Sequence, residues 1–200
     1  MKKLKEFLKK NDLGYGGLFS FAKNLTLEEF LNTCQNGIWI ASLFQKTNPR
    51  LYRVHASVAG HCVNIVRDKM KHKASLDAVD AAIKEIARKR ISDAEYEKIL
   101  DAAFDASADS PIFLYKVRLT NGVYVSSKQN APTNKAKVAG WAAWAAYSAL
   151  VCSSGTSKTD LVWSLHCTNM AYGSIKKSNK LTADICRQYL PLKIWNQNLI

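Results

Sequence analysis

The chain has little of what would assign it to several structural classes. Only 4 prolines and 9 glycines occur in 200 residues, which argues against collagen-like, linker-rich and many-turned all-β proteins. No apolar run reaches the roughly 18 residues that a membrane-spanning helix needs, and the weakly polar stretch 138–152 is mostly alanine. Glu6, Lys9 and Lys10 interrupt what would be the apolar part of a signal peptide, so we expect a cytoplasmic protein.

Cysteines are few, odd in number and never spaced as a CxxC pair. Without a secretory signal they are expected to be reduced and mostly buried. Two of them follow a histidine, in His61-Cys62 and His166-Cys167, a pattern that raises the alternatives of a zinc site or a cysteine nucleophile. Neighbours on a helix point about 100° apart, so we expect packing roles, no metal, no cofactor and no enzymatic activity. The five cysteines are Cys34, Cys62, Cys152, Cys167 and Cys186.

Apolar residues make up 48% of the chain and recur mainly at helical spacing. Capping boxes at Thr26–Glu29 and Ser92–Glu95 mark two helix starts. We predict a mainly α, irregular bundle of about seven to nine helices in one domain, residues 1–200. In the alanine-rich helix, Trp141 and Trp144 are expected to fill gaps between close neighbours. The predicted helices cover 2–10, 26–44, 48–73 (with Asn48 as its cap), 75–90 (capped by Ser75), 92–108, 135–152, 159–177 and 181–189.

Residues 113–127 have a different pattern. Tyr115, Val117 and Leu119 alternate with basic residues and lead into Asn121-Gly122, a strong signal for a tight turn between strands. We therefore expect one β-hairpin over about 113–127. The hairpin and the loop after it also suggest a subdivision of the chain near 110–134.

The charge is strongly basic and unevenly distributed. The formal net charge is +13, with 29 basic and 16 acidic residues. Residues 1–73 carry a balance of +8, residues 74–111 a balance of −4, and residues 112–200 a balance of +9. This surplus exceeds what helix capping needs and points to nucleic acid or an acidic protein as a partner, on a fold with faces of opposite sign.

One helix of the acidic third carries carboxylates at every fourth position. Four residues rise about 6 Å, so these side chains form a row along one side of the helix, which we call the acidic strip. Like charges at this spacing repel. The strip is either a solvated face neutralised by the chain's own basic residues or a docking site for a basic protein that normally binds nucleic acid. It consists of Asp93, Glu97, Asp101, Asp105 and Asp109.

Basic residues cluster toward the ends of two predicted helices. The helix macrodipole favours cations there, which is one explanation. The other is binding of nucleic acid or of an acidic partner, although no zinc finger, RNP-like segment or Walker loop accompanies them. The candidates are Arg53, Arg67, Lys69, Lys71, Lys73, Lys176, Lys177 and Lys180.

Three segments together resemble a known family. They are Leu27–Cys34 followed by Trp39, Ala78–Ile83 followed by Arg90-Ile-Ser92, and Thr182–Pro191. They resemble the alanine-rich helical immunity proteins of bacteria and their phages. The resemblance implies a helical body that neutralises a toxin by binding it.

From these patterns we expect a non-enzymatic protein that inhibits a protein partner. The partner would be a toxin, or a host defence nuclease such as a CRISPR effector if the gene is carried by a phage. The alternative is direct binding of nucleic acid by the basic N- and C-terminal thirds.

Overall fold

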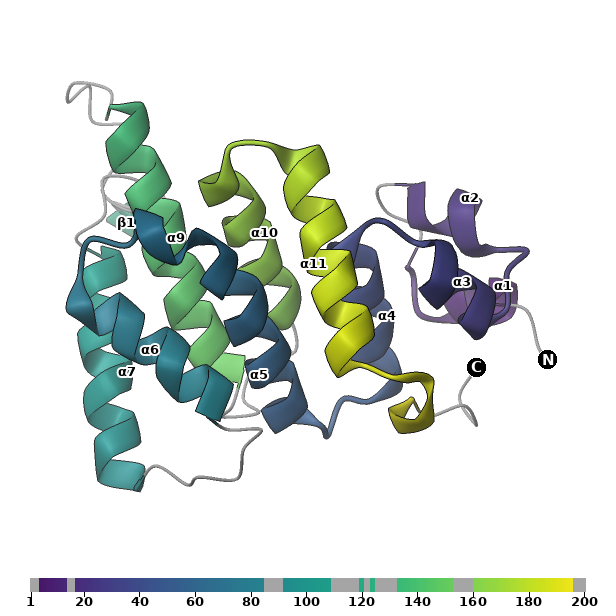
Figure 1. Ribbon diagram of the computed structural model, residues 1–200, viewed down its shortest axis with the longest axis horizontal. Helices are drawn as coiled ribbons and strands as arrows, with labels where there is room; N and C mark the ends of the chain where they lie inside the picture. The colour runs from purple at the N-terminus through teal and green to yellow at the C-terminus, as the bar shows by residue number, and fades with distance from the viewer. Residues whose placement is uncertain are drawn as a thin grey trace.

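The computed structural model describes residues 4–13, 17–84, 92–108, 119–120, 123–124, 133–152 and 160–195 (Figure 1). Helices form nearly all of this part of the chain. In chain order they are α1 (Lys5–Lys10), α2 (Leu18–Ala22), α3 (Leu27–Thr33), α4 (Gly37–Thr47), α5 (Tyr52–Val63), the 3₁₀ helix η2 (Asn64–Lys69), α6 (Lys73–Lys84), α7 (Asp93–Ala108), α9 (Asn134–Val151), α10 (Asp160–Tyr172), α11 (Ile175–Tyr189) and the 3₁₀ helix η4 (Leu192–Ile194).

The helices form an irregular bundle around α5 and α9. The alanine-rich α9 packs against α5, α6, α7 and α10, while α11 packs against α4, α5 and α10. Figure 1 shows α7 at one end of the body and the short helices α1–α3 at the other, beyond α4 and α11. Within the described ranges, no helix is both long and apolar enough to cross a bilayer.

Small residues allow the central helices to approach closely. On α9, Ala142, Ala145 and Ala149 are completely buried, and the Ser164 hydroxyl of α10 donates to the Ala145 carbonyl at 3.0 Å. Between α4 and α11, a Cβ on Gly37 would lie 2.2 Å from the Thr182 Oγ1. Only glycine fits at position 37 without separating these two helices.

Local signals placed several helix boundaries correctly. The capping box at Thr26–Glu29 is confirmed, with the Thr26 hydroxyl accepting from the Glu29 N–H and the Glu29 carboxylate accepting from the Thr26 N–H. At the start of α7 the Ser92 hydroxyl accepts from the Glu95 N–H at 3.3 Å. These short-range bonds depend only on residues near one another in sequence, which is why the sequence predicted them.

Other predicted boundaries were wrong. Asn48 does not begin a helix; its N–H donates to the Phe44 carbonyl at the end of α4, and α5 begins at Tyr52. The single helix predicted over 48–73 is instead the helix α5 followed by the 3₁₀ helix η2, and the backbone leaves helical geometry at Val66 within η2. The helix predicted over 159–177 ends at Tyr172, where Gly173 has a φ of 81°.

The predicted fold class needs a correction: the fold is all-α, and the hairpin over 113–127 is not a component of it. The structure describes only two residues on either side of the predicted turn, β1 (Leu119–Thr120) and β2 (Val123–Tyr124), and the rest of 113–127 lies outside the described residues. Asn-Gly and alternation are local signals, whereas a two-stranded ribbon needs a third strand or a covering helix to be stable. Most of the proposed subdivision at 110–134 also lies outside the described residues.

Candidate interaction surfaces

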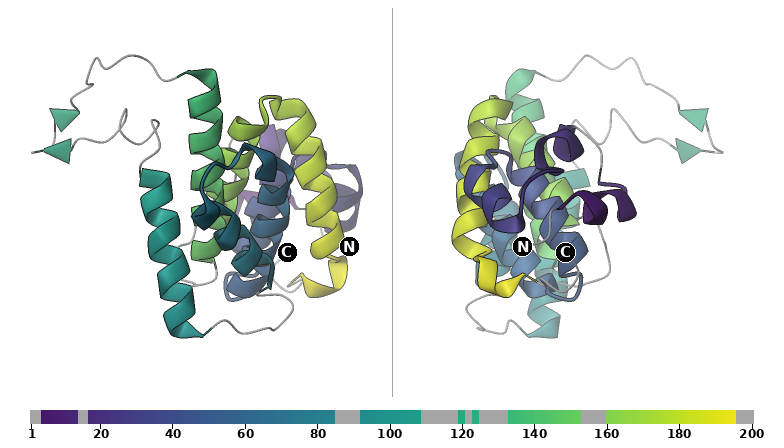
Figure 2. Two further views of the ribbon diagram at one scale, coloured as in Figure 1. Left: turned by 60° about the vertical axis from the view of Figure 1, so that its left-hand side comes forward. Right: turned by 90° about the vertical axis from the view of Figure 1, so that its right-hand side faces the viewer.

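Helix α7 is held against the bundle along one side only. Ala103, Ala106 and Ser107 are buried, and the Tyr96 hydroxyl donates to the Leu150 carbonyl of α9 at 3.3 Å. The left view of Figure 2 shows α7 and α9 side by side, with α7 at the edge of the molecule. The packing fixes which side of α7 faces solvent.

The acidic strip lies on that solvent side. Asp93, Glu97, Asp101 and Asp105 are all exposed, and they span about 18 Å of the helix axis. Asp109 lies outside the described residues. Among the residues that the structure describes, none of the four forms an ion pair. The row therefore presents one sign of charge, and basic side chains of the described chain do not neutralise it.

Both carboxylates of the neighbouring helix α6 are paired, in contrast to those of the strip. Asp80 on α6 binds the Arg67 guanidinium with both oxygens, at 2.7 and 3.0 Å, and this bond lowers the pKa of the Asp80 carboxyl. The next acid on the same helix, Asp77, binds Lys73 at 2.7 Å. The pairing that one of the two interpretations of the strip requires occurs instead on the neighbouring helix, α6.

The predicted basic residues do not form one surface. Arg53 is in the first turn of α5 and Arg67 lies beyond its other end, at least about 15 Å away along the axis. Arg67, Lys69 and Lys73 each pair with a nearby aspartate, while Lys71 is exposed between them. The first cluster is therefore largely neutralised within the chain.

The second basic cluster is different. Lys176, Lys177 and Lys180 are exposed on the first half of α11, and within the described residues none of them forms an ion pair. Figure 1 shows α11 separated from α7 by other helices, so the acidic strip and these lysines lie on different sides of the body.

The two His-Cys pairs do not converge. His61 stacks on Tyr189 of α11 with ring centroids 3.9 Å apart, and His166 stacks on Trp163 at 5.4 Å. The cysteines point into the core, where burial raises the pKa of Cys167 to about 12 and raises that of Cys62 as well. A thiol with a raised pKa is a poor nucleophile. In the described ranges no three His, Cys, Asp or Glu residues are placed to hold a metal ion.

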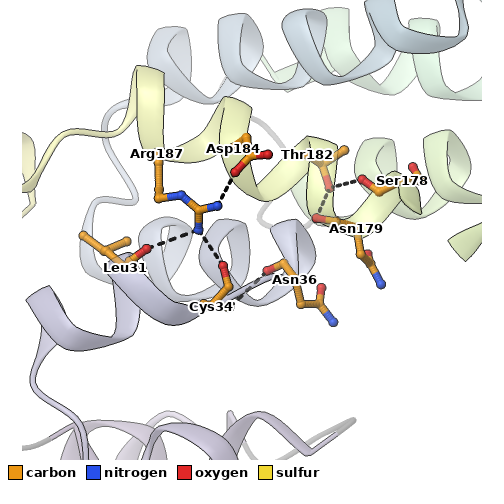
Figure 3. A network of polar contacts seen from close by, with 8 residues as sticks. All are labelled: Leu31, Cys34, Asn36, Ser178, Asn179, Thr182, Asp184 and Arg187. Atoms are coloured by element: carbon orange, nitrogen blue, oxygen red, sulfur yellow. Dashed lines mark hydrogen bonds and ion pairs between the residues drawn. The ribbon is translucent and has the colours of Figure 1, made fainter. Parts of the chain in front are cut away.

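Sequence reasoning missed Arg187, which joins α11 to the N-terminal helices (Figure 3). Its guanidinium donates to the carbonyls of Leu31 and Cys34 at the end of α3, at 3.2 and 2.6 Å, and also to the Asp184 carboxylate. The i, i+3 spacing of Asp184 and Arg187 could have predicted their pairing from the sequence. The bonds from Arg187 to α3 join residues more than 150 positions apart, and no sequence pattern predicts them.

Sequence reasoning also missed an aromatic surface that crosses three helices, which we call the aromatic belt. Trp141 and Trp144 were expected inside the bundle, yet both are only half-buried. Ring contacts link Phe104 of α7 to Tyr147 of α9 at 5.5 Å, and Trp141 of α9 to Trp163 of α10 at 6.5 Å. The belt consists of Phe104, Tyr147, Trp144, Trp141, Trp163 and His166.

A groove of about 470 Å³ lies between α6 and α7. Both lysines and carboxylates line its walls, and Ala81 and Ile99 contribute apolar surface. This mixture favours no ligand of a single charge.

No protein-family model, curated protein or solved structure matches the chain. The three segments that resemble immunity proteins lie on α3 and α4, on α6 with residues beyond it, and on α11. The resemblance to that family stays a prediction.

Proposed function

We propose that this protein is a non-enzymatic inhibitor that acts in the cytoplasm by binding a basic protein partner through the acidic strip of α7. The partner is a toxin, or a host defence nuclease such as a CRISPR effector. The observation that carries the proposal is the contrast between α6, whose two carboxylates are paired, and α7, where the four described carboxylates of the strip are exposed and unpaired among the described residues.

The strip matches the chemistry of such a partner. Proteins that bind nucleic acid align lysines and arginines to meet a row of phosphates. A rigid helix with a carboxylate every 6 Å or so offers the same sign of charge in a regular row. On a chain with a net charge of +13, the strip is also a place where a basic surface meets attraction rather than repulsion.

The test is capture of the partner from the native host with matched variants. One variant neutralises the strip: Glu97→Gln, Asp101→Asn and Asp105→Asn. The control removes three exposed negative charges from the N-terminal part of the chain instead: Glu6→Gln, Asp12→Asn and Glu28→Gln. We expect the wild type and the control to recover one protein in stoichiometric amount and the strip variant to lose it. Equal recovery by all three would contradict the proposal.

One observation favours the alternative of direct nucleic-acid binding: the exposed, unpaired lysines of α11 in the described chain. This alternative predicts retention of DNA or RNA at low salt, with the logarithm of affinity falling by roughly 0.9 per phosphate contact per decade of salt. Lys176→Gln, Lys177→Gln and Lys180→Gln together should then reduce that slope by about 3. No retention at low salt would exclude the alternative.

A further inference from the structure

The aromatic belt is a second feature of the α7 end of the molecule. Helix α9 turns its alanines toward α5, α6 and α10, and its outer face carries Trp141, Trp144 and Tyr147 at intervals of three residues. Side chains at this spacing lie next to one another on a helix. The outer face of α9 therefore supplies the middle of the belt.

Neighbouring helices extend the belt on both sides. On the α7 side, Phe104 contacts Tyr147, which in turn contacts Trp144 at 5.8 Å. On the α10 side, Trp141 contacts both Trp163 and His166, the latter at 6.3 Å. The six rings thus form two contact groups, and these meet on the outer face of α9, where Trp141 and Trp144 are three residues apart.

Large apolar side chains of this surface remain open to solvent. Phe104 and Trp163 are each 43% exposed, and Met170, one turn beyond His166 on α10, is 38% exposed. Single exposed apolar residues are ordinary, but a contiguous set on one face is typical of an interaction surface. Tryptophan and tyrosine are also the residues most enriched among the few that dominate binding energy.

The belt and the acidic strip are continuous. Phe104 lies between Asp101 and Asp105 in sequence, and helical geometry places it between the strip and the side of α7 that faces α9. A partner seated on the belt therefore reaches the carboxylates of the strip at the same time.

We propose that the belt and the strip form one docking face for a protein partner whose contact surface is rich in arginine. This proposal rests on the proposed function and names the chemistry of the partner. Arginine fits both halves of the face, because its planar guanidinium stacks on aromatic rings and also forms paired hydrogen bonds with carboxylates. Lysine has the same charge without the planar group.

A second copy of this chain is a poorer occupant. Each copy carries a net charge of +13, so the approach of two copies is opposed by their overall repulsion. A foreign basic surface faces a similar overall charge but can supply an arginine-rich patch, whereas most basic residues of this chain are lysines.

The test compares labelled deca-arginine with deca-lysine, two peptides of equal charge, by fluorescence anisotropy at low salt. The belt variant is Phe104→Ala with Trp163→Ala, and the control is Ile175→Ala with Leu181→Ala, which removes two exposed apolar side chains outside the belt. We expect the wild type and control to prefer deca-arginine by about threefold to fivefold, as for cation–π contacts at exposed sites. The belt variant should bind the two peptides within about twofold of each other. A missing preference in the wild type, or an unchanged one in the belt variant, would overturn the proposal.

Two further measurements separate this proposal from the proposed function. If neutralising the strip weakens both peptides while the belt variant keeps the arginine preference, the proposed function stands and the belt proposal fails. If neutralising the strip leaves both peptides bound as before, the proposed function fails. Sedimentation of the wild type alone should show no self-association; a dimer that the belt variant abolishes would overturn the choice of a foreign partner.

Discussion

Charged groups serve different purposes at the two ends of this molecule. At the α3–α11 contact, Arg187 is mostly covered, and its guanidinium bonds to two backbone carbonyls and one carboxylate (Figure 3). At the α7 end, Asp93, Glu97, Asp101 and Asp105 are exposed and, among the described residues, unpaired. The Arg187 guanidinium has hydrogen-bond partners within the chain, whereas the four carboxylates have no ion-pair partner among the described residues.

This difference separates groups that hold the fold from groups that are free to bind something else. Removing a charge that satisfies covered backbone carbonyls leaves those carbonyls without a partner, which costs stability. Removing like charges from an exposed row relieves repulsion. Mutations at the two ends should therefore have opposite effects on the free energy of unfolding.

The largest effect on stability is expected from a buried titratable group, His55. Its ring lies edge-on to Phe44 at 5.5 Å, and its Nε2 is buried without a hydrogen-bond partner in the described chain. Burial lowers the pKa of His55 to about 4, opposed in part by a backbone hydrogen bond with Asn48. The unfolded chain, with an ordinary pKa near 6.5, binds the proton first as the pH falls.

Stability contributed by neutral His55 is therefore complete above about pH 6.5 and is lost between about pH 6.5 and 4, by roughly 3 kcal/mol. Urea unfolding at a series of pH values measures it. His55→Phe should remove this part of the pH dependence, and identical pH profiles for the two proteins would show the account of His55 to be wrong.

A smaller loss is expected from Arg187→Ala. The change removes charge-assisted hydrogen bonds from the Leu31 and Cys34 carbonyls, and we expect a loss of about 2 kcal/mol in the free energy of unfolding. Lys177→Ala, on the exposed side of the same helix, is the control and should change stability by less than about 0.5 kcal/mol. Equal losses of stability in the two variants would contradict the claim that Arg187 holds the fold while exposed charges do not.

The smallest effect is expected from the Arg67–Asp80 pair of η2 and α6. The two side chains are 38% and 44% exposed, so solvent screens their attraction, and their coupling should be below about 1 kcal/mol. A double-mutant cycle with Arg67→Gln and Asp80→Asn measures it. A coupling energy above about 2 kcal/mol would show that this pair stabilises the fold as Arg187 does, unlike the exposed charges.

How much the sequence could predict depended on the range of the interactions. Thr26, Ser92 and the four described carboxylates of the strip were placed correctly, because a cap or an i, i+4 row involves one helix only. Asn48 was misassigned because the same residue type suits either end of a helix, and here it ends α4 instead of beginning α5.

The aromatic belt depends on long-range packing and was not predicted. Trp141 and Trp144 could face inward or outward until it is known which sides of α9 are covered by α5, α6, α7 and α10. The alanines offered the better packing surface for those neighbours, which left the indoles at the outer face. Arg187 was missed for the same reason, since its carbonyl partners lie on a helix distant in sequence.

The central claim is that the acidic strip serves a partner and not the fold. Its most direct test measures the free energy of unfolding and the affinity for deca-lysine on the variant Glu97→Gln, Asp101→Asn, Asp105→Asn, beside the control Glu6→Gln, Asp12→Asn, Glu28→Gln. The account predicts unchanged or slightly higher stability for the strip variant, with an affinity at low salt about tenfold or more below that of the control. A strip variant that loses more than about 1 kcal/mol of stability and binds the peptide as tightly as the control would contradict it.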